Sequence, residues 1–215
     1  MRKLFIIALL ITFGISFGQE KKEPLNIEKG TWNLGGNFTY SNSSSETNNT
    51  STNAENDQFY IGFYPQVGYA IKNNLIIGMG VGYEYRKNEN YYSETEIYNS
   101  KQNGIVVFPY VKKFFNVNTK VSFHLQGEFR MSKTWNDNND LSNLTSNDNN
   151  TRSLFVGVRP GLTIFLAKKL ALETSIGALG YSTGKNKADS RETKFDSFSF
   201  NLNPNNLVFG LSYYF

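Results

Sequence analysis

The sequence predicts an all-β fold, an eight-stranded antiparallel β-barrel that spans a membrane and follows a cleaved signal peptide. Three observations lead to this prediction. The chain of 215 residues is rich in aromatic residues and glycine, segments of alternating hydrophobicity recur along it, and no later segment is apolar over the length of a helix. Without such a helix, a chain that enters a membrane must close its strands into a barrel, because unpaired backbone groups are too costly in hydrocarbon.

The composition is typical of a β protein with polar connections. The chain has 13 Tyr, 18 Phe and 18 Gly, one His and no Cys, and only 19% of its residues are charged. Aromatic residues favour strands. The absence of Cys excludes a disulfide framework and a lipid-modified amino-terminal cysteine.

The first 18 residues have the layout of a secretory signal peptide. Arg2 and Lys3 precede an apolar run from Leu4 to Phe13, and small residues follow up to Gly18. The run is shorter than the roughly 20 residues that a transmembrane helix needs. We expect cleavage after Gly18, a short periplasmic lead over residues 19–29, and the barrel over residues 30–215.

The charge of the chain gives no indication of a nucleic-acid partner. Without Arg2 and Lys3, 20 of the 22 basic residues remain against 18 acidic ones, and they are scattered. Proteins that bind nucleic acid carry clustered basic residues. We therefore expect no nucleic-acid partner, and no motif indicates a cofactor.

Eight segments are expected to be strands, joined by connections that alternate between short and long. The expected strands are residues 30–42, 57–71, 74–87, 101–115, 119–134, 152–166, 169–184 and 197–215. The long connections are polar and cover residues 43–56, 88–100, 135–151 and 185–196. Short turns at one end and long loops at the other are typical of bacterial outer-membrane barrels, with the long loops outside the cell.

A proline recurs at a matching place in the even-numbered strands. The patterns are Ile61-x-Phe63-x-Pro65-x-Val67, Ile105-x-Val107-x-Pro109-x-Val111 and Val156-x-Val158-x-Pro160-x-Leu162. The eighth segment carries Pro204, after which the alternation slips by one residue. Because proline donates no hydrogen bond to a ladder, we expect a repeated bulge or bend at these places.

The residues on the less apolar face of each strand distinguish a membrane barrel from a soluble β protein. In residues 75–86 one face is large and apolar, whereas the other carries Gly78, Gly80 and Gly82. In residues 121–131 the second face is mostly small or polar. A soluble protein would place many Lys and Glu side chains there, whereas small and weakly charged residues suit a narrow lumen.

The carboxyl end carries the sharpest indication of a membrane barrel. Phe209, Leu211, Tyr213 and Phe215 alternate with smaller or more polar residues, and the sequence ends on Phe215. This pattern resembles the terminal signature that the barrel-insertion machinery recognises in outer-membrane proteins. We expect these four residues to form the insertion signal.

These features make the whole mature chain resemble the small outer-membrane β-barrels of Bacteroidetes, which are porin-like barrels of the OmpA and OmpX type. The resemblance rests on the proline-containing strands, on Leu75-Ile76-Ile77-Gly78 and on the Tyr213-Tyr214-Phe215 end. It implies a location in the bacterial outer membrane, contact with outer-membrane lipid and a monomeric barrel. It specifies architecture rather than activity.

Charged residues on the expected inner face are the first candidates for a functional site. Charge inside a narrow lumen is costly unless it is paired, so a polar network is expected. A regular outer hairpin would place Glu128 within a residue or two of Arg159, which predicts an ion pair between them. Such a network either locks the interior or serves a gated, ion-conducting path. Its expected members are Glu84, Arg86, Glu128, Arg130, Arg159 and Glu173.

A hydrolase is a weaker alternative. His124 shares the inner face with Ser122 and Glu128. However, neighbours on one face of a strand stand about 6.8 Å apart, too far for direct proton transfer. The position near the periplasmic end also does not suit a lipid A-modifying enzyme. We therefore expect no enzymatic activity.

Two further groups of residues have mainly structural interpretations. Asp137, Asp140 and Asp148 lack the glycine and the closing glutamate of a calcium loop, so we expect no metal site. Tyr91, Tyr92 and Tyr98 could contact a ligand or extend the strands. Aromatic residues near strand ends are expected to form two girdles at the headgroup level. These residues are Trp32, Tyr40, Tyr69, Tyr83, Tyr85, Phe115, Trp135, Phe165 and Tyr213.

The function that the sequence favours is a structural or porin-like role in the outer membrane. The alternative is an adhesin or recognition protein that binds an unidentified extracellular ligand through its outer loops.

Overall fold

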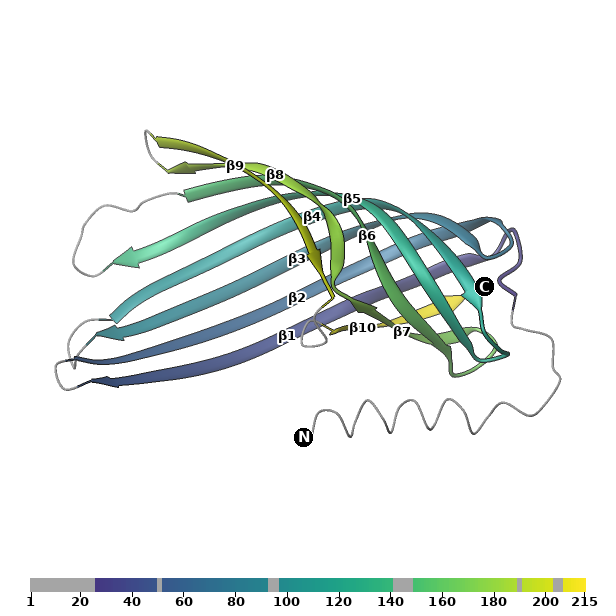
Figure 1. Ribbon diagram of the computed structural model, residues 1–215, viewed down its shortest axis with the longest axis horizontal. Coiled ribbons are helices and arrows are strands. Elements are labelled where there is room, and N and C mark those ends of the chain that lie inside the picture. The colour runs from purple at the N-terminus through teal and green to yellow at the C-terminus, as the bar shows by residue number, and fades with distance from the viewer. Residues whose placement is uncertain (1–25, 50–51, 93–96, 141–148, 189–190, 203–206) are drawn as a thin grey trace.

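The computed structural model describes residues 26–49, 52–92, 97–140, 149–188, 191–202 and 207–215, which form an antiparallel β-barrel (Figure 1). Its strands are β1 (Trp32–Asn49), β2 (Thr52–Lys72), β3 (Leu75–Tyr92), β4 (Ile97–Asn116), β5 (Val121–Asp140), β6 (Asn149–Phe165), β7 (Leu170–Ile176), β8 (Ala178–Ala188), β9 (Arg191–Asn201) and β10 (Leu207–Tyr214). The predicted signal peptide lies outside the described residues, as does most of the periplasmic lead. None of the described residues forms a helix long and apolar enough to cross a membrane.

The ten strands of the described residues occupy eight positions in the wall. β7 and β8 follow one another along β6. In the same way β10 pairs with β7, and β9 pairs with β8. The sheet closes on itself because β6 pairs with β5, and β10 pairs with β1. The predicted eight-stranded antiparallel barrel is confirmed.

The last two positions of the wall are interrupted partway up. Gly177 separates β7 from β8 and has a φ of 59°, which glycine adopts without the steric penalty of a side chain. A Cβ at this position would also meet the carbonyl oxygen of Asn201. The predicted slip at Pro204 lies outside the described residues, between β9 and β10. Among the described residues β1 pairs with β10 up to Phe38, and no ladder joins β1 to β9.

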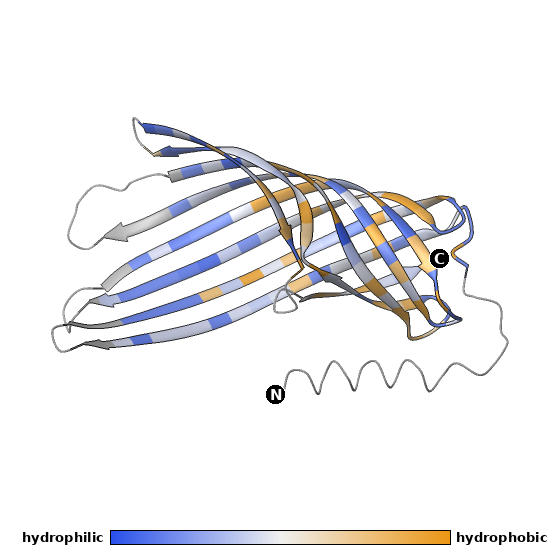
Figure 2. Ribbon diagram, viewed as in Figure 1, coloured by the Kyte–Doolittle hydropathy of each residue, from blue (hydrophilic) through white to orange (hydrophobic). Residues whose placement is uncertain are grey.

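The outer connections are much shorter than predicted, because the strands continue into the expected loops. β1 and β2 stay paired up to Asn49 and Thr52, and β5 and β6 stay paired up to Asn136 and Asn149. Figure 2 shows that these outer halves are largely hydrophilic, whereas apolar residues gather in the half that holds the carboxyl end. This half has the short turns and is the one expected to face the periplasm, so it is called the periplasmic half. In these outer halves both faces of the strands are polar, so the hydrophobic periodicity of the sequence did not reveal that the strands continue. Tyr91, Tyr92 and Tyr98 take part in this ladder.

Alternation along each strand separates the two faces of the wall. On β3 the side chains of Ile77, Met79 and Val81 are exposed, whereas Ile76, which precedes them, is buried in the lumen. On β10 and just after it, the four residues of the predicted insertion signal are all exposed on the outer face. The main chain of Phe215 exchanges hydrogen bonds of 2.7 and 2.9 Å with Trp32, which closes the barrel at its periplasmic end.

Aromatic residues border the apolar band at both ends. At the periplasmic end the rings of Trp32 and Tyr69 lie 5.1 Å apart. At the outer end Phe59 contacts Tyr40 and Tyr85, at ring distances of 5.8 and 6.2 Å. At about 3.4 Å per residue and a tilt of roughly 40°, the stretch from Phe59 to Tyr69 is about 25 Å tall, which matches a membrane barrel.

Phe165 is not part of a girdle, and that prediction is wrong. Its side chain is 4% exposed and faces the lumen, where its ring lies 5.4 Å from that of Tyr214. Alternation along β6 places Phe165 on the same face as the buried Thr163. Ile27, from the lead before β1, is buried in the same apolar cluster and exchanges two 2.9 Å hydrogen bonds with Asn74. The apolar cluster therefore forms a floor to the barrel.

Gly80 provides the space that the buried ring of Phe108 fills, because a Cβ on Gly80 would collide with that ring. We expect Gly80→Leu to lower the free energy of unfolding by about 1–3 kcal/mol, the usual effect of overpacking. Urea titration in lipid vesicles would measure the change. Adding Phe108→Ala should recover part of the loss, and an equal loss in the double variant would argue against this contact as the cause.

Candidate functional site

The lumen contains two buried polar networks, one above the other. The central network surrounds Glu128 of β5 and includes Gln126, Arg130 and Arg159. The periplasmic network surrounds Glu173 of β7 and includes Lys112 and Tyr214. Between and around them the lumen is filled by buried aromatic side chains, which are Tyr64, Phe108, Tyr110 and Phe114.

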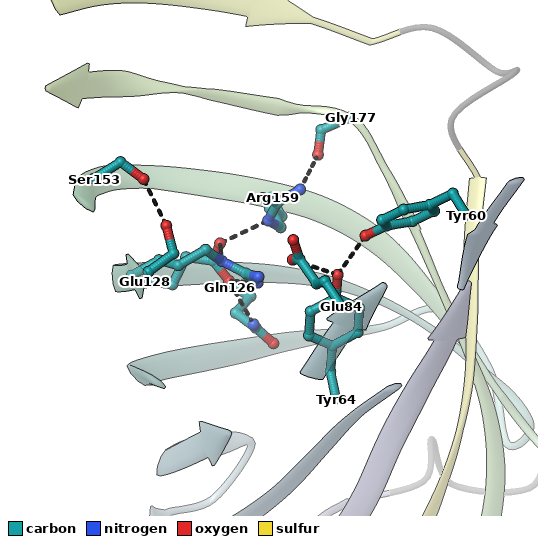
Figure 3. A network of polar contacts seen from close by, with 10 residues as sticks. Tyr60, Tyr64, Glu84, Gln126, Glu128, Ser153, Arg159 and Gly177 are labelled. Carbon is teal, nitrogen blue, oxygen red and sulfur yellow. Dashed lines mark hydrogen bonds and ion pairs between the residues drawn. The ribbon is translucent and has the colours of Figure 1, made fainter. Parts of the chain in front are cut away.

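Glu128 is the centre of the central network (Figure 3). Its side chain is 0% exposed, and its Oε1 lies 2.7 Å from Nε of Arg159 and 3.1 Å from Nε of Arg130. The amide of Gln126 donates to the other carboxylate oxygen at 3.1 Å. In the ladder Glu128 lies opposite Gly157, two residues from Arg159, which is the spacing that the hairpin predicted. The expected ion pair between Glu128 and Arg159 is present.

The two arginines extend this network across the lumen. The guanidinium of Arg130 stacks on Phe108 and on Tyr64, 4.6 and 5.5 Å from the ring centroids. Arg159 lies over the ring of Phe155 at 5.5 Å and donates to the carbonyl oxygen of Gly177 at 3.4 Å. Cation–π contacts of this kind strengthen when they are shielded from water. The network therefore joins strands on opposite sides of the barrel.

Glu84 and Arg86 belong to a neighbouring cluster of tyrosines. The hydroxyl of Tyr64 donates to Oε1 of Glu84 at 2.6 Å, and the hydroxyls of Tyr60 and Tyr64 are 2.7 Å apart. Arg86 lies over the Tyr60 ring at 5.2 Å. Tyr64 thus contacts both Glu84 and Arg130. Of the six predicted residues, Arg130 and Arg159 form ion pairs with Glu128. Glu84 and Arg86 contact the tyrosines Tyr64 and Tyr60 instead. Glu173 belongs to the separate periplasmic network.

The periplasmic network is more deeply buried. Nζ of Lys112 lies 2.6 Å from Oε2 of Glu173, and the side chains are 2% and 5% exposed. The hydroxyl of Tyr214 donates to Oε1 of Glu173 at 2.7 Å. Nζ of Lys112 also lies 5.5 Å from the centroid of Tyr110. The pair connects β4 to β7, which are not neighbours in the sheet, so it crosses the lumen.

Sequence reasoning missed Lys112, Tyr64 and Tyr214. A signal was present for Lys112, because it alternates in phase with Phe108 and Phe114 and opposite to Val111. The tyrosines were less visible, because each is flanked by aromatic or apolar residues of the opposite face, Phe63 and Pro65 for Tyr64 and Tyr213 and Phe215 for Tyr214. A tyrosine can face either side of a membrane barrel, so residue type alone did not identify these two.

The structure does not bring Ser122, His124 and Glu128 together. The Ser122 hydroxyl donates to Oδ1 of Asn116 at 2.7 Å, and Nδ1 of His124 lies 2.8 Å from Oγ1 of Thr163. Glu128 is engaged by the arginines. Among the described residues no group of three or more His, Cys, Asp or Glu side chains is placed to hold a metal ion.

Comparisons with known proteins find a family match and similar solved structures. A family model described as the autotransporter beta-domain matches residues 10–213. Neisserial surface protein A is 15% identical with a TM-score of 0.44, over 87% of this chain and 100% of that one. A major outer membrane protein from Thermus thermophilus is 12% identical with a TM-score of 0.47, over 86% of this chain and 99% of that one. No curated protein matches at a significant level.

The family match covers nearly the whole described barrel, from before β1 to the end of β10. Together with the closed antiparallel sheet and the apolar outer band, it shows that the chain is an outer-membrane β-barrel and belongs to the autotransporter beta-domain family.

Proposed function

We propose that this barrel is a structural outer-membrane protein with a locked lumen, rather than an open pore. The observation that carries the proposal is the 2.6 Å pair between Lys112 and Glu173, which crosses the lumen and is almost fully buried. The Glu128 network forms a second crossing above it. An eight-stranded barrel leaves an interior just wide enough for side chains, and these side chains fill it.

A permeating ion would have to pass both networks. Breaking a buried ion pair leaves an uncompensated charge at low dielectric, which typically costs several kcal/mol. Conduction requires binding sites weak enough for ions to leave. Tight pairs supported by Tyr214 and by buried rings do not meet this requirement. The proposal assigns no catalytic role to the lumen, because Ser122 and His124 hydrogen-bond to neighbours that support the wall.

Single-channel recording in a planar bilayer tests the locked lumen. We expect the wild-type barrel to give no steady conductance. We expect the variant Lys112→Ala/Glu173→Ala/Glu128→Ala/Arg159→Ala to conduct, because it removes the ion pairs of both crossings. The variant Lys185→Ala/Glu192→Ala is the matched control, since it removes an exposed pair of 3.1 Å on the outer hairpin. A heat-dependent shift in gel mobility would show that each barrel is folded. Steady wild-type conductance would contradict the proposal.

A recognition role is the second candidate, favoured by the height of the outer wall. The ladder between β2 and β3 continues for many residues above the aromatic girdle, up to Ala54 and Tyr92. In this region a hollow of ≈ 490 Å³ is lined by Phe59 and by polar and charged residues of β1, β2 and β3, including Glu55, Asp57 and Glu89. Such a rigid polar surface suits a soluble extracellular partner. Replacing residues 43–56 by a short turn would distinguish a recognition role from a purely structural one. The shortened barrel should still fold, but it should no longer bind an extracellular partner.

A further inference from the structure

The outer face of the barrel carries a row of four basic side chains on neighbouring strands. The ladders place Lys133 of β5 opposite Arg152 of β6, Arg152 opposite Lys185 of β8, and Lys185 opposite Lys194 of β9. All four are exposed. Neighbouring strands lie about 4.8 Å apart, so this basic row is roughly 14 Å long and runs obliquely because the strands tilt.

The basic row marks the upper border of the lipid-facing band. On β5 the next outward residue toward the periplasm is the exposed Met131, and on β6 it is the exposed Leu154, which lies opposite Met131. Ile105 of β4 lies opposite Lys133 and is also exposed. A hollow of ≈ 630 Å³ is lined by these apolar residues together with all four basic ones. Charge and apolar surface therefore meet in one place.

The positive charge of the row is only partly neutralised by the protein. Glu192 lies 3.1 Å from Lys185 and 3.7 Å from Lys187, and the Lys185 ammonium lowers the pKa of that carboxyl. Within the described part of the chain no carboxylate forms an ion pair with Lys133, Arg152 or Lys194. Asp196 shares the outer face of β9 but lies opposite Thr183, one pair closer to the membrane. Like charges directly opposite one another in a ladder are unfavourable, so an anion would stabilise the row.

The other side of the barrel has a different border. There the apolar band ends in the aromatic residues Tyr40, Phe59 and Tyr85, which favour the headgroup level. Lys87 of β3 and Lys101 of β4 lie opposite each other just above this border, but Lys87 is paired with Glu89 at 2.8 Å and Lys101 lies opposite Asp137. Among the residues that the structure describes, the four-residue row without a paired acidic side chain at Lys133, Arg152 and Lys194 thus lies on β5, β6, β8 and β9. An asymmetric border of this kind indicates one particular neighbour on that side.

We propose that the basic row and the hollow beside it bind a phosphorylated lipid of the outer leaflet. Lys133, Arg152 and Lys185 would donate charge-assisted hydrogen bonds to its phosphates, and Arg152 can do so with two donors at once. The acyl chains would lie along Met131, Leu154 and the apolar band below them. A soluble anion would contact only the charges, whereas one phosphorylated lipid contacts both the charges and the apolar surface beside them. The proposal is independent of whether the lumen conducts.

Trp135 offers a direct reporter of this site. It follows Lys133 on the outer face of β5, and the only other tryptophan is Trp32 at the periplasmic end. In a Trp32→Phe background, the refolded barrel in zwitterionic detergent micelles would be titrated with bis-phosphorylated lipid A. We expect a saturable change in Trp135 fluorescence. Dephosphorylated lipid A and inorganic phosphate, each titrated alone, should give a much weaker response.

Charge-neutralising variants test which residues are responsible. Lys133→Gln/Arg152→Gln/Lys185→Gln should weaken binding roughly tenfold or more, because it removes the charged donors. The matched control is Lys72→Gln/Lys113→Gln/Lys168→Gln, which changes net charge equally at exposed periplasmic positions and should bind within about twofold of the parent. Heat-dependent gel mobility confirms folding. Equal affinities of the two triple variants, or equal binding of dephosphorylated lipid or inorganic phosphate, would overturn the proposal.

Discussion

Replacing Lys112 by methionine is expected to lower the free energy of unfolding by about 3–5 kcal/mol, because it leaves Glu173 as a buried carboxylate without its cation. The two side chains are 2% and 5% exposed, so water does not replace the lost partner. Tyr214 still donates one hydrogen bond to Glu173, but a neutral donor does not compensate a full charge. Urea titration of the barrel in lipid vesicles, followed by the heat-dependent gel shift, would measure the change.

The double variant Lys112→Met/Glu173→Leu distinguishes loss of an ion pair from loss of packing. Apolar residues of similar volume can replace a buried ion pair with little change in stability, so the double variant should recover most of the loss. If Lys112→Met alone stays within about 1 kcal/mol of wild type, the pair does not carry the stability assigned to it. If the double variant is less stable than the single one, packing around Lys112 is the more important contribution.

Much of this fold followed from local patterns in the sequence. Apolar alternation identified the membrane-spanning part of every strand, because each strand contacts lipid on one face and a narrow lumen on the other. A short connection was expected at Lys72 and Asn73, and the structure places the turn at Asn73 and Asn74, between Lys72 and Leu75. A hairpin between β5 and β6 was sufficient to place Glu128 near Arg159. These features depend on contacts between neighbours in the chain or between adjacent strands.

Contacts across the lumen could not be predicted from these local patterns. The pair between Lys112 and Glu173 joins strands that are three positions apart in the wall, so its existence depends on strand tilt and stagger rather than on a hairpin. Phe165 illustrates the same limit. An aromatic residue at a strand end suits a girdle by type, yet the alternation of β6 and the apolar floor around Ile27 place it inside.

The height of the barrel was also underestimated, for a different physical reason. Above the membrane both faces of a strand meet water, so residues such as those of 43–49 show no hydrophobic period. Their strand structure is held by main-chain hydrogen bonds between β1 and β2, which the side-chain pattern does not encode. The basic row on the outer face is likewise not visible as a pattern in the sequence. Its four members come from separate segments and gather only through the registers of β5, β6, β8 and β9.

Replacing Glu128 by alanine is expected to lower the free energy of unfolding by about 3 kcal/mol, at the lower end of the range for breaking a buried pair. The variant leaves the guanidinium groups of Arg130 and Arg159 without their shared carboxylate inside the lumen. Their side chains are 21% and 27% exposed, so some water reaches them, and the effect should be smaller than for Lys112→Met. Urea titration under the same conditions makes the two values comparable.

Glu192→Ala is the matched control for this prediction. It removes the same chemical group from an ion pair of similar length, but Lys185 and Glu192 are 53% and 37% exposed on the outer hairpin. Exposed pairs contribute little because water screens them and holding two long side chains is entropically unfavourable. Stability should therefore fall for Glu128→Ala and stay nearly unchanged for Glu192→Ala. Equal effects would mean that water reaches the centre of the lumen freely, and the barrel would then have to be regarded as a water-filled pore.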